Sequence, residues 1–253
     1  MASDSKFAVL IDADNVSVKY IKIILDEISK DGVATYKRIY GDWTNPALVS
    51  WKSTLLDHSV LPIQQYSYTT GKNSTDSAMI IDAMDILYSE QVDGFCLVSS
   101  DSDFTRLAAR LRESGMTVIG MGESKTPNSF IAACNKFKYL DILSKADEEE
   151  ENRAVSKAKK PAEPKPAGGK EELKTSLSTI RQALRAIVRE NAEEDDWMFV
   201  GKVGHILGKR YPDFDVRNYG YNKLTLFLDS LDLFEMKSER KDNNAPLFYI
   251  RLK

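Results

Sequence analysis

The chain has 253 residues, of which 42% are hydrophobic and 29% charged, an ordinary composition for a globular protein. This length leaves room for one medium α/β domain and a small second domain. A formal net charge of −3 excludes a protein that is basic overall, so any nucleic-acid binding must come from local patches.

Short apolar strands alternate with amphipathic helices in the first part of the chain. Strands are expected at 7–11, 33–40, 60–65, 95–98 and 116–121, and a last short strand before residue 143. Helices are expected at 16–30, 46–58, 75–87 and from 104 onwards, with one more before the last strand. This alternation predicts an α/β domain at 1–143, a parallel sheet with helices on both faces.

The pattern stops at residues 144–173. An acidic run at 147–151 is followed by a segment rich in Lys, Ala, Pro and Gly that has almost nothing to bury. Such a composition predicts a disordered or extended linker.

Periodicity returns at 174–253, which we expect to be a second domain. Helices are expected at 177–188, 200–207 and 224–231, followed by two strands joined by a polar turn at 242–246. Three short helices and a terminal hairpin predict a small winged-helix (α+β) domain.

The cysteines and the apolar runs indicate the compartment. Cys96 and Cys134 both lie in apolar segments and are expected to be buried free thiols, as in a reducing compartment. The start of the chain has no secretory apolar region, and no apolar run approaches the ~20 residues that span a bilayer. We therefore expect a cytoplasmic protein that does not enter the membrane.

Carboxylates follow two of the predicted strands and begin one helix. Asp12 and Asp14 end the first strand, Asp101 and Asp103 end the fourth, and Asp76 lies at the head of the helix between them. If the first and fourth strands are neighbours, these side chains meet at the carboxyl edge of the sheet, where open α/β sheets bind ligands. Helix capping is the alternative for Asp14 and Asp101 individually.

Grouped carboxylates repel one another, so such a cluster needs a cation or raised pKa values. Oxygen ligands without Cys or His favour a hard divalent ion, Mg²⁺ or Mn²⁺. One or two such ions activate water and stabilise the leaving oxygen in phosphodiester hydrolysis. The chain lacks a Walker lysine loop, so an ATP-dependent mechanism is not indicated.

The first domain resembles the NYN domain, in its LabA-like branch, which groups with the PIN-like metal-dependent ribonucleases. The resemblance covers most of residues 6–143 and is carried by FAVLIDADN at 7–15, IYGDW at 39–43, KNSTD at 72–76, LVSSDSDF at 97–104 and SFIAACNKF at 129–137. It implies a PIN-like (Rossmannoid) fold. Carried over, the metal ligands and catalytic acids fall on Asp12, Asp76, Asp101 and Asp103, with Asn15 as their polar support.

The second domain resembles the LOTUS (OST-HTH) winged-helix module. The matching segments are FVGKVGHIL at 199–207, YPDF at 211–214, YGY at 219–221 and LTLFL at 224–228. That family is associated with RNA, including structured G-rich RNA, and with protein partners. The resemblance therefore implies single-stranded or structured RNA as a partner, and protein partners for the winged-helix domain.

Several side chains are candidates for contacting RNA. In the first domain, Lys72 and Ser100 would hold phosphate and Trp43 would stack on a base; simple exposure of Lys72 and plugging of the rim by Trp43 are the alternatives. In the second domain basic and aromatic residues interleave, which suits single-stranded RNA, although acidic residues lie close by. They are Lys202, Lys209, Arg210, Arg217, Tyr219 and Lys223.

The leading hypothesis is a divalent-metal-dependent endoribonuclease whose second domain recruits RNA across the linker. One alternative is an RNA-binding or adaptor protein with a silent acidic pocket. Another is a HAD-like phosphatase, because DADNV at 12–16 superficially fits the nucleophile motif of that class. The sequence leaves the RNA substrate, DNA acceptance, the number of metal ions and the oligomeric state open.

Overall fold

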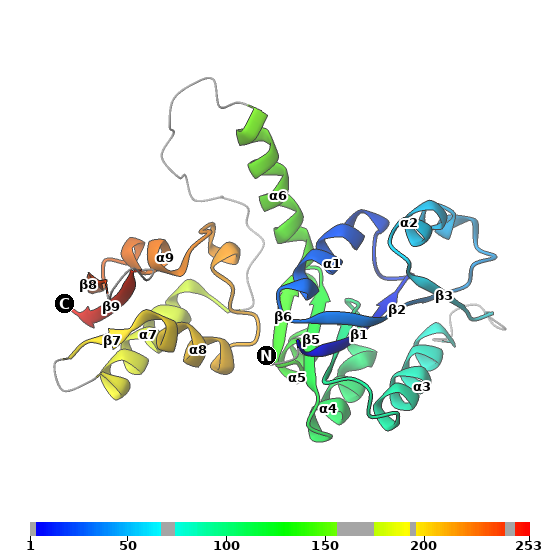
Figure 1. Ribbon diagram of the computed structural model, residues 1–253, viewed down its shortest axis with the longest axis horizontal. Helices are drawn as coiled ribbons and strands as arrows, with labels where there is room; N and C mark the ends of the chain where they lie inside the picture. Colours follow the sequence, from blue (N-terminus) through cyan, green and yellow to red (C-terminus); the bar gives the residue numbers. More distant parts are fainter. Residues whose placement is uncertain (1–3, 67–73, 156–174, 193–195, 241–245) are drawn as a thin grey trace. The chain divides into compact units, whose positions relative to one another are not determined.

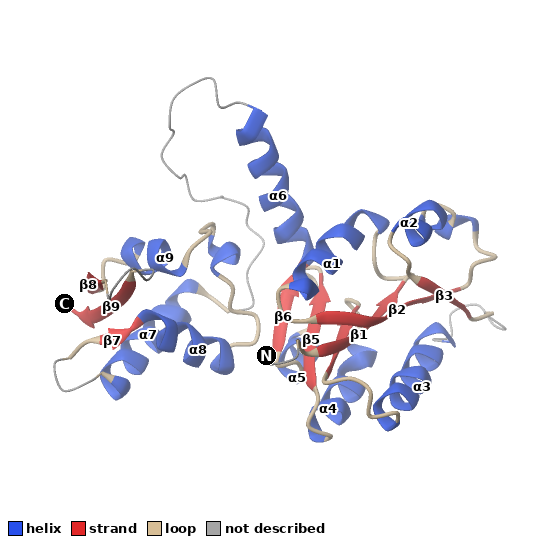
Figure 2. Ribbon diagram, in the orientation of Figure 1, coloured by secondary structure: helices blue, strands red, loops and turns tan. Residues whose placement is uncertain are grey.

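The computed structural model describes residues 4–66, 74–155, 175–192, 196–240 and 246–253. Its internal contacts divide the chain into two units, Met1–Lys145 and Ala146–Lys253. Figure 1 shows the elements of each unit, and Figure 2 shows their secondary structure. Among the helices formed by described residues, none combines the length and apolarity required for crossing a bilayer.

The first unit is built on a six-stranded parallel sheet, as predicted. Its strand order is β3-β2-β1-β4-β5-β6. The strands are β1 (Lys6–Asp12), β2 (Val33–Gly41), β3 (Leu61–Gln64), β4 (Gly94–Val98), β5 (Thr117–Gly122) and β6 (Lys136–Tyr139). The direction of chain progression reverses between β1 and β4, which makes the carboxyl ends of these two neighbours the switch point of the sheet.

Helices cover both faces of this sheet, as predicted. They are α1 (Ile21–Ser29), α2 (Trp51–Asp57), α3 (Ser74–Tyr88), α4 (Thr105–Glu113), α5 (Asn128–Ala133) and α6 (Leu140–Val155). In Figure 1, α1 lies over one face, and α3, α4 and α5 lie under the other. Two predicted helices begin with separate 3-10 turns, at Val18–Tyr20 and Pro46–Leu48.

Strand β1 is apolar on both sides because both of its faces are covered. Val9 and Ile11 pack in one core cluster with Ile24 of α1. Ala8 and Leu10 alternate with them and are equally buried. Asp12, the last residue of the strand, therefore carries its charge into a fully buried position.

Helix α6 differs from the sequence expectation. The helix continues to Val155, so the first part of the segment predicted as a linker is helical. The physical reason is composition, since residues 145–155 are rich in Ala, Glu, Lys and Arg, which favour helix. Residues 156–174, the remainder of the predicted linker, lie outside the described residues.

The second unit contains the three predicted helices and an antiparallel sheet. The helices are α7 (Leu177–Asn191), α8 (Val200–Arg210) and α9 (Leu224–Ser230). The strands β7 (Met198–Phe199), β8 (Phe234–Glu239) and β9 (Leu247–Leu252) follow the order β7-β9-β8. Strand β7 is too short for periodicity to reveal it, and most of the predicted turn at 242–246 lies outside the described residues.

Candidate metal centre

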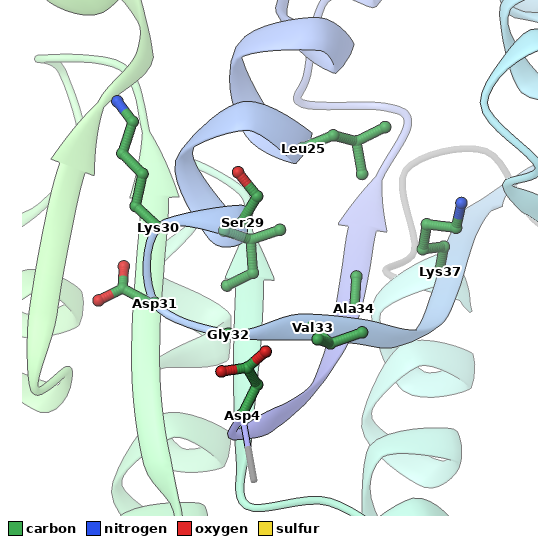
Figure 3. Close-up of a pocket in the computed structure, with 10 residues that line it drawn as sticks. Asp4, Leu25, Ser29, Lys30, Asp31, Gly32, Val33, Ala34 and Lys37 are labelled. Atoms are coloured by element: carbon green, nitrogen blue, oxygen red, sulfur yellow. The ribbon is translucent and has the colours of Figure 1, made fainter. Parts of the chain in front are cut away.

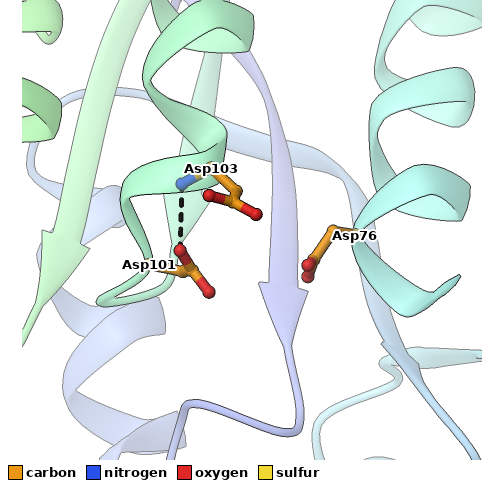
Figure 4. Close-up of side chains that lie close together, drawn as sticks. All are labelled: Asp76, Asp101 and Asp103. Atoms are coloured by element: carbon orange, nitrogen blue, oxygen red, sulfur yellow. Dashed lines mark hydrogen bonds between the residues drawn. The ribbon is translucent and has the colours of Figure 1, made fainter. Parts of the chain in front are cut away.

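Three carboxylates converge at the carboxyl edge of the sheet. Asp76 lies in the first turn of α3, and Asp101 and Asp103 follow β4. One oxygen from each carboxylate lies within 4.8 Å of the others (Figure 4). The condition stated for such a cluster, that the first and fourth strands are neighbours, is met in the sheet.

Local structure after β4 holds two of these carboxylates. Asp101 is the N-cap of a 3-10 turn at Ser102–Phe104, and its Oδ1 accepts a hydrogen bond from the Asp103 backbone N–H at 2.9 Å. The capping alternative for Asp101 and its place in the cluster are therefore both correct. The cap fixes the backbone from which the two carboxylates project.

Asp12 lies beside this group but is not one of its three members. Its side chain is fully buried, and its Oδ2 accepts hydrogen bonds from Asn15 Nδ2 at 2.7 Å and Ser99 Oγ at 2.8 Å. Its Oδ1 accepts the Asp14 backbone N–H at 3.1 Å. Ser99 Oγ in turn accepts the Asp101 N–H at 3.1 Å, so one hydroxyl joins the acidic ends of β1 and β4.

Burial and neighbouring negative charges raise the pKa values of two carboxyl groups, those of Asp76 and Asp12. Burial, followed by the charges of Asp12, Asp101 and Asp103, raises the pKa of Asp76 from its ordinary value near 3.8 to about 6. Burial also raises the pKa of Asp12, although hydrogen bonds from Asn15 and Ser99 oppose this shift. A cation bound here would relieve both costs.

The donor set fits a hard divalent cation. Oxygens on opposite sides of a bound Mg²⁺ are about 4 Å apart, since each Mg–O distance is about 2.0–2.1 Å. Adjacent oxygens around the ion are closer, about 2.9 Å apart, so the three carboxylate oxygens, which lie within 4.8 Å of one another, would have to move together to bind one ion directly. All three donors are carboxylates, the ligands that Mg²⁺ and Mn²⁺ prefer.

The other residues predicted for this edge have different surroundings. Trp43 is half-buried against the core, and its indole N–H donates to the Ile63 carbonyl at 3.0 Å, which favours the plugging alternative over stacking. Ser100 Oγ accepts the Glu123 N–H at 2.9 Å beside the cluster. Lys72 lies outside the described residues.

The residues of the second unit that were predicted to contact RNA differ in their surroundings. Lys202, Lys209, Arg210 and Lys223 are exposed. Arg217 is bound to Asp215, with its Nη2 2.6 Å from Oδ2.

Tyr219, a predicted RNA-contacting residue, takes part in the packing of the second unit. Its ring centroid lies 5.2 Å from that of Phe227, and its hydroxyl donates to the Thr175 carbonyl at 2.9 Å. Burial raises its pKa. The half-buried ring of Tyr219 therefore packs within the unit, and its contact with RNA stays a prediction.

Three of the four exposed basic side chains predicted to contact RNA, those of Lys202, Lys209 and Arg210, lie on α8, and the fourth, Lys223, is the N-cap residue of α9. In winged-helix proteins that read duplex DNA, the second helix of the helix-turn-helix pair enters the major groove. Helix α9 contains no Lys or Arg, whereas Lys202 and Lys209 lie two turns apart on one side of α8. This distribution suits contacts to a phosphate backbone better than insertion of α9 into a groove.

A hollow of about 480 Å³ lies at the opposite edge of the first sheet (Figure 3). It is lined by residues where α1 ends and β2 begins, among them Ser29, Asp31 and Val33. The amino ends of parallel strands are not where such sheets bind ligands. The hollow is therefore separate from the acidic cluster.

Sequence reasoning missed Ser99. The residue is fully buried and contacts both acidic strand ends. Its only signal was its place in the Ser-Ser-Asp run after β4, which does not distinguish a bridging hydroxyl from an ordinary turn residue.

Comparison with known proteins identifies both parts of the chain. Residues 6–141, more than half of the chain, match the family model of the NYN domain. Residues 175–245 match that of the OST-HTH/LOTUS domain. Both predicted resemblances, and their order, are confirmed. No curated protein matches the chain significantly.

Two solved structures are similar. A crystal structure of a protein of unknown function from Vibrio parahaemolyticus is 18% identical, covers 55% of this chain and 94% of its own, and gives a TM-score of 0.47. A solution structure of an uncharacterized protein from Nitrosomonas europaea is 29% identical, covers 38% of this chain and 90% of its own, and gives a TM-score of 0.28.

Proposed function

The chain belongs to the NYN domain family, and on this premise we propose that it is a divalent-metal-dependent endoribonuclease. The observation that carries the proposal is the convergence of Asp76, Asp101 and Asp103 within 4.8 Å at the switch point of the sheet. The segment that suggested the phosphatase alternative, 12–16, lies within the NYN match, which disfavours that alternative.

In this proposal, Asp76, Asp101 and Asp103 hold a Mg²⁺ or Mn²⁺ ion, and Asp12 completes the negative field from its buried position. The ion supplies activation of water and stabilisation of charge on the cleaved phosphate. Asn15 and Ser99 keep Asp12 oriented, each by a hydrogen bond to its Oδ2. The Asp101 cap keeps the backbone of Asp101 and Asp103 in place.

A covalently closed circular RNA tests the reaction, because only internal cleavage can linearise it. We expect the full chain to linearise single-stranded circles with Mn²⁺ or Mg²⁺ and not with EDTA. A chain that binds RNA but never cleaves it with either ion would contradict the nuclease proposal. That outcome would leave the RNA-binding or adaptor alternative.

We further propose that the LOTUS domain recruits RNA through the exposed cations of α8 and Lys223. Two of these, Lys202 and Lys209, give the sharpest test. Replacing both by Ala should weaken binding to single-stranded RNA. It should also reduce the slope of log affinity against log salt by about 0.7 for each phosphate that is no longer neutralised.

The matched control replaces the same two lysines by Arg, which keeps both charges and should keep the salt slope. Fluorescence anisotropy with a labelled single-stranded RNA at several salt concentrations measures both quantities. An unchanged slope in the Ala variant would show that α8 does not contact phosphate.

The domain limits and the compartment remain proposals. We propose a nuclease domain at 1–143 and an RNA-recruiting domain at 174–253, joined by 144–173. We also propose a cytoplasmic protein, supported by Cys96 and Cys134, which are buried free thiols.

A further inference from the structure

Helix α3 carries Asp76 and makes a polar contact with the sheet at Asp82. Asp82 of α3 accepts hydrogen bonds from Arg38 and from the Tyr40 hydroxyl, one on each carboxylate oxygen. Arg38 and Tyr40 lie two residues apart on β2 and so face the same side. A single carboxylate thus binds two points of one strand.

Apolar side chains of α3 are buried as well. Met79, Ala83 and Ile86 are the buried side chains of the helix centre. Burial of apolar surface is not directional, so it holds the helix against the sheet without fixing its rotation or its position along its axis. Charge-assisted hydrogen bonds do fix both.

Through Tyr40, the polar contact at Asp82 involves β2, the strand that pairs with β1 next to Asp12. Tyr40 is fully buried and is the register partner of Asp12 in the pairing of β1 with β2. Its carbonyl accepts the Ala13 N–H at 2.9 Å. Burial raises the pKa of Tyr40, so the hydroxyl keeps the proton that it donates.

Asp76 lies six residues before Asp82, about 9 Å along the axis of the same helix. A shift of α3 would therefore move Asp76 relative to Asp101 and Asp103, which are fixed by the turn after β4. We infer that Asp82 is a positioning residue that, by holding Arg38 and Tyr40, keeps the Asp76 carboxylate beside Asp101 and Asp103. This inference rests on the proposed function only in taking Asp76 as a metal ligand.

The test compares the full chain with Asp82→Asn and with Asp85→Asn, the same change at an exposed position of the same helix. Free Mn²⁺ is followed by electron paramagnetic resonance during titration, without RNA. We expect Asp82→Asn to bind Mn²⁺ about 10-fold more weakly, the lower end for residues that orient ligands, and Asp85→Asn to bind as wild type.

A second measurement separates positioning from general damage. Cleavage by Asp82→Asn should need more Mn²⁺ and should approach the wild-type kcat at saturating Mn²⁺. A loss of folded protein would lower kcat at every Mn²⁺ concentration. If Asp82→Asn does not fold, Tyr40→Phe removes one hydrogen bond to Asp82 and keeps the ring.

A failure of the wild type to bind Mn²⁺ would count against the proposed function alone. In that case a crystal structure of Asp82→Asn still tests the inference. The Asp76 oxygens should then lie beyond 4.8 Å from those of Asp101 and Asp103. The inference is overturned if Asp76 keeps its position relative to Asp101 and Asp103 in the Asp82→Asn structure. It is also overturned if the wild type binds Mn²⁺ and Asp82→Asn binds it equally tightly.

Discussion

An Asp101→Asn variant is expected to lose at least about 100-fold in kcat for RNA cleavage. Metal ions supply several kcal/mol of charge stabilisation, and each 1.36 kcal/mol is a factor of ten in rate. The substitution removes a charged ligand oxygen but keeps an amide oxygen that can still accept the Asp103 N–H. The loss should therefore come from the missing charge rather than from an altered turn.

Single-turnover cleavage of a labelled RNA, with equal circular dichroism spectra for both proteins, measures this effect. Asp57→Asn, the same change at an exposed position of α2, is the matched control and should cleave as wild type. Cleavage by Asp101→Asn at the wild-type rate would show that the acidic cluster is not the catalytic site. Asp12→Asn is a weaker test, because an amide nitrogen there would face the hydrogen-bond donors Asn15 or Ser99, or the Asp14 N–H.

Mn²⁺ affinity is expected to fall about tenfold per pH unit below about pH 6. A carboxylate must lose its proton to bind the ion, and the pKa of Asp76 is raised to about 6 by burial and by the charges of Asp12, Asp101 and Asp103. An ordinary Asp, with a pKa near 3.8, would keep full affinity down to about pH 5. Mn²⁺ titration between pH 4.5 and 7.5 measures the difference, and a flat profile above pH 5 would contradict it.

The raised pKa of Asp76 also predicts how the stability of the metal-free protein depends on pH. Stability should fall as the pH rises, whereas Mn²⁺ affinity should increase. Between about pH 4 and 6, Asp76 is protonated in the folded protein and ionised in the unfolded chain, so the folded state binds more protons. This contribution to stability is therefore present at low pH and is lost as the pH rises through about 6. The difference in Tm between wild type and Asp76→Asn should shrink or reverse towards pH 4, because the amide does not titrate.

The sheet and its acidic edge were predictable because their signals are local. Apolar runs followed within three residues by Asp marked β1 and β4, and the alternation of strands with helices predicted parallel pairing. Once β1 and β4 were assumed to be neighbours, convergence of their acidic ends followed from the geometry of parallel strands. The family resemblance rested on these same segments.

What the sequence did not show depends on contacts between distant residues. The same Asp type binds three hydrogen-bond donors at position 12 and anchors a helix at position 82, and nothing within either segment distinguishes these roles. The packing of Tyr219 on Phe227 was not visible in the sequence, because the two residues lie on different helices. Helix α6 continues past the predicted boundary because residues 145–155 have a composition that favours helix.

The strand order makes the first unit two halves, β1 to β3 and β4 to β6, that share only the β1–β4 seam within the sheet. Asp12 belongs to the first half, and Asp101 and Asp103 belong to the second. Helix α3, which carries Asp76, lies between the two halves in sequence. Asp12 and the two carboxylates after β4 therefore come together only when β1 and β4 pair.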